Sequence, residues 1–117
     1  MNERSARIKK QMLANAASYN ERAIKQHQSK DFVVDTARVY GTFRPIETAV
    51  SHPEYNDGLW IIVQAYDTEE DAVLGHDRWV EVLEAELPDE LVDCINGEIA
   101  QLWVEAGGNP VFRRQHG

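Results

Sequence analysis

The chain has 117 residues, of which 43% are apolar, and its formal net charge at pH 7 is −8. This length suits one small domain. The single cysteine, Cys94, excludes an internal disulfide and a multi-cysteine metal site. The apolar runs of the chain are far shorter than the roughly 20 residues of a membrane span, and the sequence does not begin with a signal-peptide pattern. We therefore expect a reducing cytoplasm and no membrane segment.

The charge is divided unevenly along the chain. Residues 1–30 contain seven basic and two acidic residues, a net charge of +5, whereas residues 31–117 carry −13. Between residues 67 and 105 there are thirteen acidic residues and one basic residue, Arg78. The sequence therefore consists of two oppositely charged parts.

The N-terminal segment has a helical pattern. Residues 2–28 contain no proline or glycine and are rich in helix-favouring residues. One narrow apolar stripe recurs at spacings of three and four, made of Ile8, Met12, Ala16, Tyr19 and Ala23. Because so weakly amphipathic a helix gains most of its stability by docking, we interpret residues 1–30 as a basic helical arm. Residues 26–30 read as its linker.

The middle of the chain predicts strands. Residues 32–50 are rich in β-favouring types, and Pro45 suits a sheet edge. The Asp57-Gly58 pair suits a tight turn, and residues 59–66 have the clearest strand pattern. We expect an antiparallel hairpin of two or three strands.

The C-terminal half predicts two helices. Thr68, followed by acidic residues, is typical of a helix start, and Pro88 would end that helix. A second apolar stripe predicts a helix from near Asp89 to the glycines at 107–108, with Cys94 packed in the core. The predicted fold is α+β, with a core domain over residues 31–108 and a flexible tail over 109–117.

Both faces of the strand at residues 59–66 are apolar. By alternation, Trp60, Ile62 and Tyr66 lie on one face and the other apolar residues on the opposite face. Two C-terminal helices can cover one face. The second face must be covered by the N-terminal helix, by another subunit or by a partner, because a hairpin with one solvated face alternates more cleanly.

No motif in the sequence indicates catalysis. The four histidines, at positions 27, 52, 76 and 116, lack metal-ligand spacing. The acidic residues at 67–71 lack the pattern of a calcium loop, and no phosphate-binding loop or nucleophile motif occurs. We therefore predict no catalytic, metal-binding or cofactor-binding residues.

The charge pattern leaves several kinds of partner open. The basic arm could contact nucleic acid, dock on an acidic protein surface, or pack on its own domain. Phosphates would repel the acidic body, so we favour protein docking over direct nucleic-acid binding. The acidic helices could instead imitate DNA phosphates and occupy a DNA-binding protein.

Four short segments resemble small, mostly uncharacterised proteins of tailed bacteriophages. They are residues 47–50 (ETAV), 56–60 (NDGLW), 65–72 (AYDTEEDA) and 75–80 (GHDRWV). The shared pattern is a strand, an Asp-Gly turn, a tryptophan-bearing strand and a helix containing Gly-His. The resemblance implies a phage genome as the origin, and a virion or the bacterial host cytoplasm as the location. It implies no catalytic residues.

These observations lead to a structural hypothesis. We expect a non-enzymatic phage structural or assembly protein, such as a head, neck or tail component, that forms an oligomer or part of a larger assembly. The expected interface residues lie on the arm and the hairpin: Arg7, Ile8, Met12, Tyr19, Trp60, Ile62 and Tyr66. The alternative is a small acidic inhibitor of a host protein.

Overall fold

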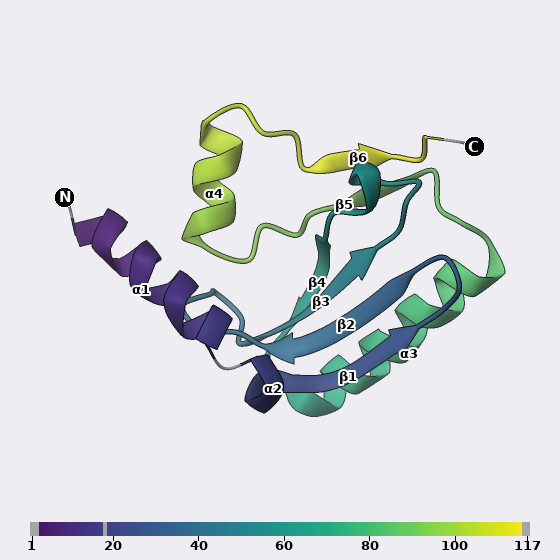
Figure 1. The fold of residues 1–117 in the computed structure, drawn as a ribbon, viewed down its shortest axis with the longest axis horizontal. Helices are drawn as coiled ribbons and strands as arrows, with labels where there is room; N and C mark the ends of the chain where they lie inside the picture. Colours follow the sequence, from purple (N-terminus) through teal and green to yellow (C-terminus); the bar gives the residue numbers. More distant parts are fainter. Residues whose placement is uncertain (1–2, 18, 116–117) are drawn as a thin grey trace.

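The computed structural model describes the backbone of residues 3–17 and 19–115, and the side chains of residues 3–10 and 20–115. The predicted α+β fold is confirmed, with an N-terminal helix, an antiparallel sheet and helices in the C-terminal half (Figure 1). The elements are α1 (Glu3–Ala17), α2 (Tyr19–Arg22), β1 (Ala23–Gln28), β2 (Val33–Arg38), β3 (Ile46–Ser51), a short 3-10 helix η1 (Asn56–Gly58), β4 (Ile61–Tyr66), α3 (Glu69–Ala85), β5 (Glu90–Val92), α4 (Glu98–Glu105) and β6 (Val111–Arg113).

Four antiparallel strands form the main sheet in the order β1-β2-β3-β4, with α3 packed across one face (Figure 1). Each strand pairs with its neighbour in sequence, as short connections favour. β5 and β6 form a separate two-stranded sheet beside β4. The molecule therefore has a helical layer on one side of the sheet, while the small sheet lies beside β4 and the start of α4 lies near the β2–β3 turn (Figure 1).

One extra residue in β4 determines which of its side chains face α3. Ala49 pairs with Ile62, but its neighbour Thr48 pairs with Gln64, so Val63 forms a β-bulge. Because side chains alternate between the faces of a sheet, an extra residue reverses the alternation of every residue that follows it.

The bulge turns Tyr66 toward α3. The Tyr66 ring is buried against Gly75, where an added Cβ would lie 2.3 Å from the Tyr66 hydroxyl oxygen. Trp60 and Ile62, which precede the bulge, lie on the opposite face. The prediction that these three residues share one face is therefore wrong, because simple alternation does not hold across a bulge.

The core lies between α3 and the sheet and extends to β5. Its main cluster consists of buried side chains from the sheet, α3, β5 and the loops: Phe32, Val34, Val50, Tyr55, Ile61, Val63, Leu83 and Leu91. Each large apolar side chain contributes about 1.5–3 kcal/mol when it is fully buried. This cluster therefore supplies much of the stability that fixes the sheet against α3.

A chain of buried polar groups crosses the same layer. His76 Nδ1 lies 2.7 Å from Thr36 Oγ1, which lies 2.6 Å from Thr48 Oγ1. Thr48 Oγ1 in turn lies 3.0 Å from the Tyr66 hydroxyl oxygen. All four residues are buried. Burial lowers the pKa of His76, and the nearby charge of Lys25 lowers it further, so the folded protein favours the neutral imidazole.

The N-terminal helix is shorter than the prediction over residues 2–28. α1 ends at Ala17, and residues 23–28 form the edge strand β1. Lys25 and His27 of this strand reach acidic residues of α3. These contacts, together with the hydrogen bonds to β2, outweigh the helix propensity of the segment.

The second C-terminal helix also differs from the prediction. It was expected to start near Asp89, whereas α4 begins at Glu98. Residues 90–92 form β5, which pairs with residues 111–113 of the predicted tail. Leu91 explains the difference: it is buried in the core, and an extended strand places it there while its two neighbours point outward.

The buried histidine predicts a pH dependence of stability. As the pH falls below about 6.5, the unfolded chain takes up a proton that folded His76 resists, so the free energy of unfolding decreases. The His76→Gln variant lacks this titration. Urea unfolding at pH 7.5 and 5.5 should show a loss of stability that is smaller in the variant by up to about 1.4 kcal/mol. Equal losses in both proteins would contradict the assignment of this dependence to His76.

Candidate functional site

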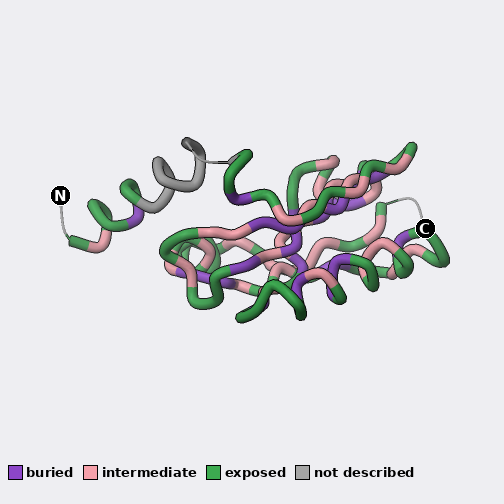
Figure 2. Tube along the Cα trace, turned by 90° about the horizontal axis from the view of Figure 1, so that it is seen from below, coloured by how far each residue is buried: buried purple, intermediate pink, exposed green. Residues whose placement is uncertain are grey.

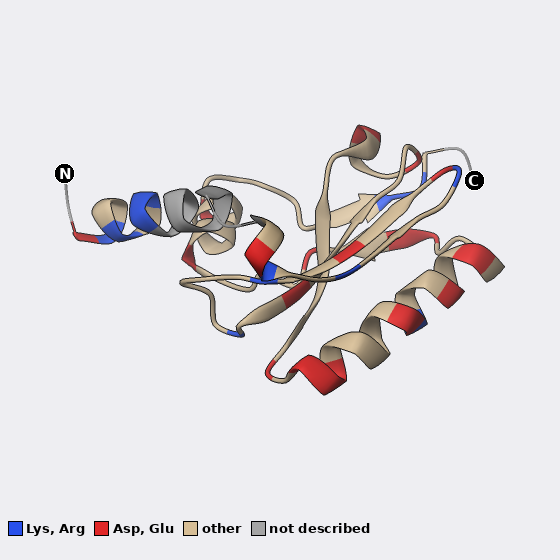
Figure 3. Cartoon of the chain, turned by 60° about the horizontal axis from the view of Figure 1, so that its bottom comes forward, with Lys and Arg blue, Asp and Glu red and all other residues tan. Residues whose placement is uncertain are grey.

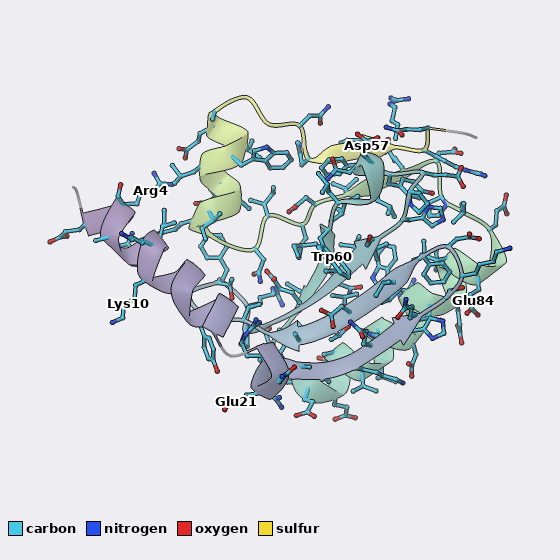
Figure 4. All side chains as sticks on the ribbon, in the orientation of Figure 1. Arg4, Lys10, Glu21, Asp57, Trp60 and Glu84 are labelled. Carbon is cyan, nitrogen blue, oxygen red and sulfur yellow. The ribbon has the colours of Figure 1, made fainter. Side chains whose placement is uncertain are left out.

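The sheet face opposite α3 is partly open. α1 extends away from the sheet and does not lie across this face (Figure 1). Trp60 lies on it with 51% of its surface exposed (Figure 4). Ala49 and Ile62 beside it are half-buried. Large apolar groups are therefore accessible on the face that the sequence predicted to need a cover.

An apolar groove lies where this open face meets α4. Its volume is about 420 Å³, within the range of small-ligand sites. The lining comes from the β2–β3 turn, from β3 and β4, and from the segment that leads into α4. The side chains that determine its chemistry are Tyr40, Glu47, Ile62, Asp93, Asn96 and Trp103.

Asn96 holds the two walls of the groove together. Its Oδ1 accepts a hydrogen bond of 2.8 Å from the backbone N–H of Arg44, and its Nδ2 donates to the Arg44 carbonyl at 2.9 Å. Nδ2 also donates to Glu47 Oε2 at 2.9 Å. A backbone bridge between Thr42 and Gly97 continues this contact. Because Asn96 is itself buried, these bonds form in a region of low dielectric, where they are strong.

The segment before Asn96 has an unusual backbone. Ile95 has a φ of 53°, in the left-handed region that is rare for β-branched residues. Such a conformation costs about 1–3 kcal/mol and persists only where its surroundings impose it. Here the Ile95 N–H donates to Asp93 Oδ1 at 2.8 Å, and the Asp93 N–H donates to the Pro110 carbonyl at 2.8 Å. These bonds fix the Asp93 carboxylate beside the groove.

Two carboxyl groups in this region are costly to ionise. Partial burial raises the pKa of Glu47; its bond from Asn96 opposes the rise, and the nearby charge of Asp93 adds to it. Partial burial also raises the pKa of Asp93, while its bond from Ile95 opposes the rise. For each carboxylate, the hydrogen bond that it accepts therefore compensates only in part for the loss of hydration on burial.

Trp103 forms the α4 side of the groove. Its indole stacks on Phe112 of β6 with the ring centroids 6.1 Å apart. It also packs over Gly108, where an added Cβ would lie 2.3 Å from the indole ring. The glycine is thus needed for the close approach of the ring. Trp103 remains 39% exposed, so a bound group can reach it.

α1 is attached to α4 beside the groove. Arg7 makes a bidentate ion pair with Glu98, with distances of 2.7 and 3.0 Å, and Arg4 lies 3.7 Å from Glu105. Ile8 is buried. The N-terminal end of α1 extends away from the sheet (Figure 2). The predicted interface side chains of Met12 and Tyr19 lie outside the described side chains.

The structure brings only some of the predicted interface residues together. Trp60 and Ile62 share the open face, whereas Arg7 and Ile8 lie on α1 and Tyr66 lies in the core. The sequence prediction missed the groove because it placed the segment that contains Asp93 and Asn96 inside a helix. The Asn-Gly pair at 96–97 was the available signal, since it is typical of turns.

Two of the four histidines, His52 and His76, lie in the core. His76 is fully buried in the polar chain, and His52 is buried between Phe32 and Tyr55 with its Nδ1 accepting the Glu54 N–H. Within the described residues, no cluster of three or more His, Cys, Asp or Glu side chains has metal-binding geometry.

The chain was compared with protein-family models, with curated proteins and with solved structures, and none of them matches it. Among the helices formed by the described residues, none combines the length and apolar character that a membrane crossing requires.

The acidic residues near the groove affect the pKa of Cys94. Cys94 lies at the surface, not in the predicted helical core. Partial burial and the carboxylates of Asp93 and Glu47 raise its pKa from 9.0 to about 11. The thiolate is therefore scarce at neutral pH, and the greater nucleophilicity of a more basic thiolate offsets only part of this loss.

Alkylation of Cys94 by iodoacetamide at pH 7.5 should be roughly tenfold slower than that of an unperturbed thiol. The Asp93→Asn variant should react faster, because a neighbouring negative charge is removed. Asp31→Asn, at an exposed position between β1 and β2, is the matched control and should leave the rate unchanged. Equal rates for all three proteins, measured by mass spectrometry over time, would contradict this account.

Proposed function

We propose that this chain is a non-enzymatic assembly protein of a phage particle, a head, neck or tail component that binds neighbouring protein subunits. The open sheet face with its groove, together with α1, would form the contact surfaces. The observation that carries the proposal is the accessible apolar surface around the groove. The resemblance of residues 47–80 to small phage proteins supplies the phage origin.

The distribution of apolar groups supports binding to protein. Eleven large apolar side chains of the described residues are exposed. They include Ile99, Leu102, Trp103 and Val104, so half of the eight residues of α4 are exposed apolar residues. Ile99 and Trp103 also line the groove. Extended apolar and aromatic surface of this kind is typical of protein interfaces.

The attachment of α1 supports a role as a docking arm. The ion pairs of Arg4 and Arg7 with α4 are exposed to solvent, and such pairs contribute little to stability in water. An acidic surface on a neighbouring subunit could offer the same cations equivalent partners. The arm could therefore change its contacts without loss of the sheet or its core.

The acidic inhibitor is a second candidate, favoured by the acidic residues along α3 (Figure 3). Glu70 and Glu81 on α3, and Glu86 directly after it, are exposed. Other acidic residues of α3, however, pair with basic residues of β1 and β2, among them Lys25 and Arg38. These pairs give part of the acidic surface a local structural role and favour the assembly function.

Deletion of residues 2–17 tests the proposed function. The deletion removes α1 but keeps β1, because removal of residues 23–28 would take an edge strand from the sheet. We expect the truncated protein to fold, with a cooperative thermal transition, but to be lost from purified phage particles as measured by mass spectrometry. Normal incorporation of the truncated protein would rule out docking through α1.

A triple charge reversal separates the two candidates. Glu70→Lys and Glu81→Lys on α3, with Glu86→Lys directly after it, change exposed residues that do not line the groove. An assembly protein should retain normal incorporation with these changes. Loss of binding to a host protein, together with normal incorporation of the α1 deletion, would favour the inhibitor.

A further inference from the structure

The groove contains negative charge that no cation of the described residues neutralises by a direct ion pair. Glu47 accepts a hydrogen bond from Asn96, and Asp93 accepts one from the Ile95 N–H. Of the arginines in this region, Arg7 pairs with Glu98, Arg38 with Glu69 and Arg44 with Asp67. Arg22 is buried, and its Nη1 donates to the Arg38 carbonyl at 2.8 Å while its charge lowers the pKa of Glu47. A cation that entered the groove would therefore meet two carboxylates that make no direct ion pair with the described residues.

The walls of the groove suit the remainder of a basic side chain. Ile62 and Val39 offer apolar surface to an aliphatic stem, and Tyr40 and Trp103 offer aromatic rings. Basic side chains bury their stems along apolar surface while their charged ends reach polar partners. A guanidinium or ammonium group also gains from contact with the face of a tryptophan or tyrosine ring.

The carboxylates are held in place before any ligand arrives. The bonds of Asn96 fix Glu47 to the β2–β3 turn, and the left-handed Ile95 directs its N–H at Asp93. A fixed site loses less conformational entropy on binding than a flexible one. This arrangement also gives the strained backbone at Ile95 a role, since it maintains the position of a binding group.

We propose that the groove binds an arginine or lysine side chain from a segment of a partner protein. Glu47 and Asp93 would receive the cation, while Tyr40, Ile62 and Trp103 would enclose its stem. Arginine fits better, because its planar group can donate to two carboxylates at once. The inference rests on the proposed function and deepens it by naming the chemistry of the partner.

A peptide pair provides the first test. The full-length ¹⁵N-labelled protein is titrated with acetyl-Leu-Arg-Leu-amide and with the same peptide containing citrulline, the neutral isostere of arginine. We expect the arginine peptide to shift the amide signals of residues 93–100 and the indole signal of Trp103. The citrulline peptide should bind at least roughly 30-fold more weakly, because it leaves the carboxylates without a cation.

Matched variants provide the second test. Glu47→Gln and Asp93→Asn should each weaken binding of the arginine peptide, whereas Asp31→Asn, at an exposed position outside the groove, should not. The amide oxygen that Glu47→Gln introduces can still accept the Asn96 hydrogen bond, so this variant should remain folded, which thermal unfolding will establish. Equal binding of the two peptides, shifts outside the groove, or unchanged affinity in both folded groove variants would each overturn the proposal.

The outcome is separable from that of the proposed function. If the arginine peptide fails to bind but deletion of residues 2–17 still removes the protein from particles, the assembly function stands without this ligand. If the peptide binds as expected but the protein that lacks residues 2–17 is incorporated normally, the groove site is supported and docking through α1 is contradicted.

Discussion

Val63, the unpaired residue of β4, separates the side chains that stabilise the sheet from those available for binding. By reversing the alternation, it brings the Tyr66 hydroxyl within hydrogen-bonding distance of Thr48, and so completes the buried chain that ends at His76. Trp60, which precedes the bulge, stays on the opposite face. Without the extra residue, Tyr66 would point to the open face, and Thr48 Oγ1 would keep Thr36 as its only partner in this chain.

Much of the central fold follows from local sequence signals. Thr68 caps α3 as predicted, with its Oγ1 accepting the Asp71 N–H at 3.2 Å, and the strand pattern before it corresponds to β4. The errors lie at β1 and β5, where the local pattern favours helix. Residues 23–28 become a strand through pairing with β2 and contacts with α3, and Leu91 is drawn into the core by packing. Neither contact is visible in a window of neighbouring residues.

The groove could not be predicted because its parts come from distant segments. Glu47 and Asp93 are remote in sequence, and nothing local indicates that Asn96 bonds to both the β2–β3 turn and Glu47. One sequence prediction did point toward the groove, namely that the second apolar face of the β4 segment needs a cover. It depends only on the composition of that segment. Ile62 belongs to that face and also lines the groove. The apolar character of Ile62 can be read from the sequence, whereas its proximity to the carboxylates of Glu47 and Asp93 depends on the tertiary structure.

The position of β1 has a mechanical consequence. α1 leads through α2 directly into β1, which is the edge strand of the main sheet. Tension applied to α1 would therefore be carried first by β1, whose hydrogen bonds to β2 can open one after another from the end where the load enters. Lys25 and His27 reach acidic residues of α3 along this path and would resist its opening. An edge strand loaded in this way yields before the buried core, so the chain can extend under force while the rest of the sheet remains folded.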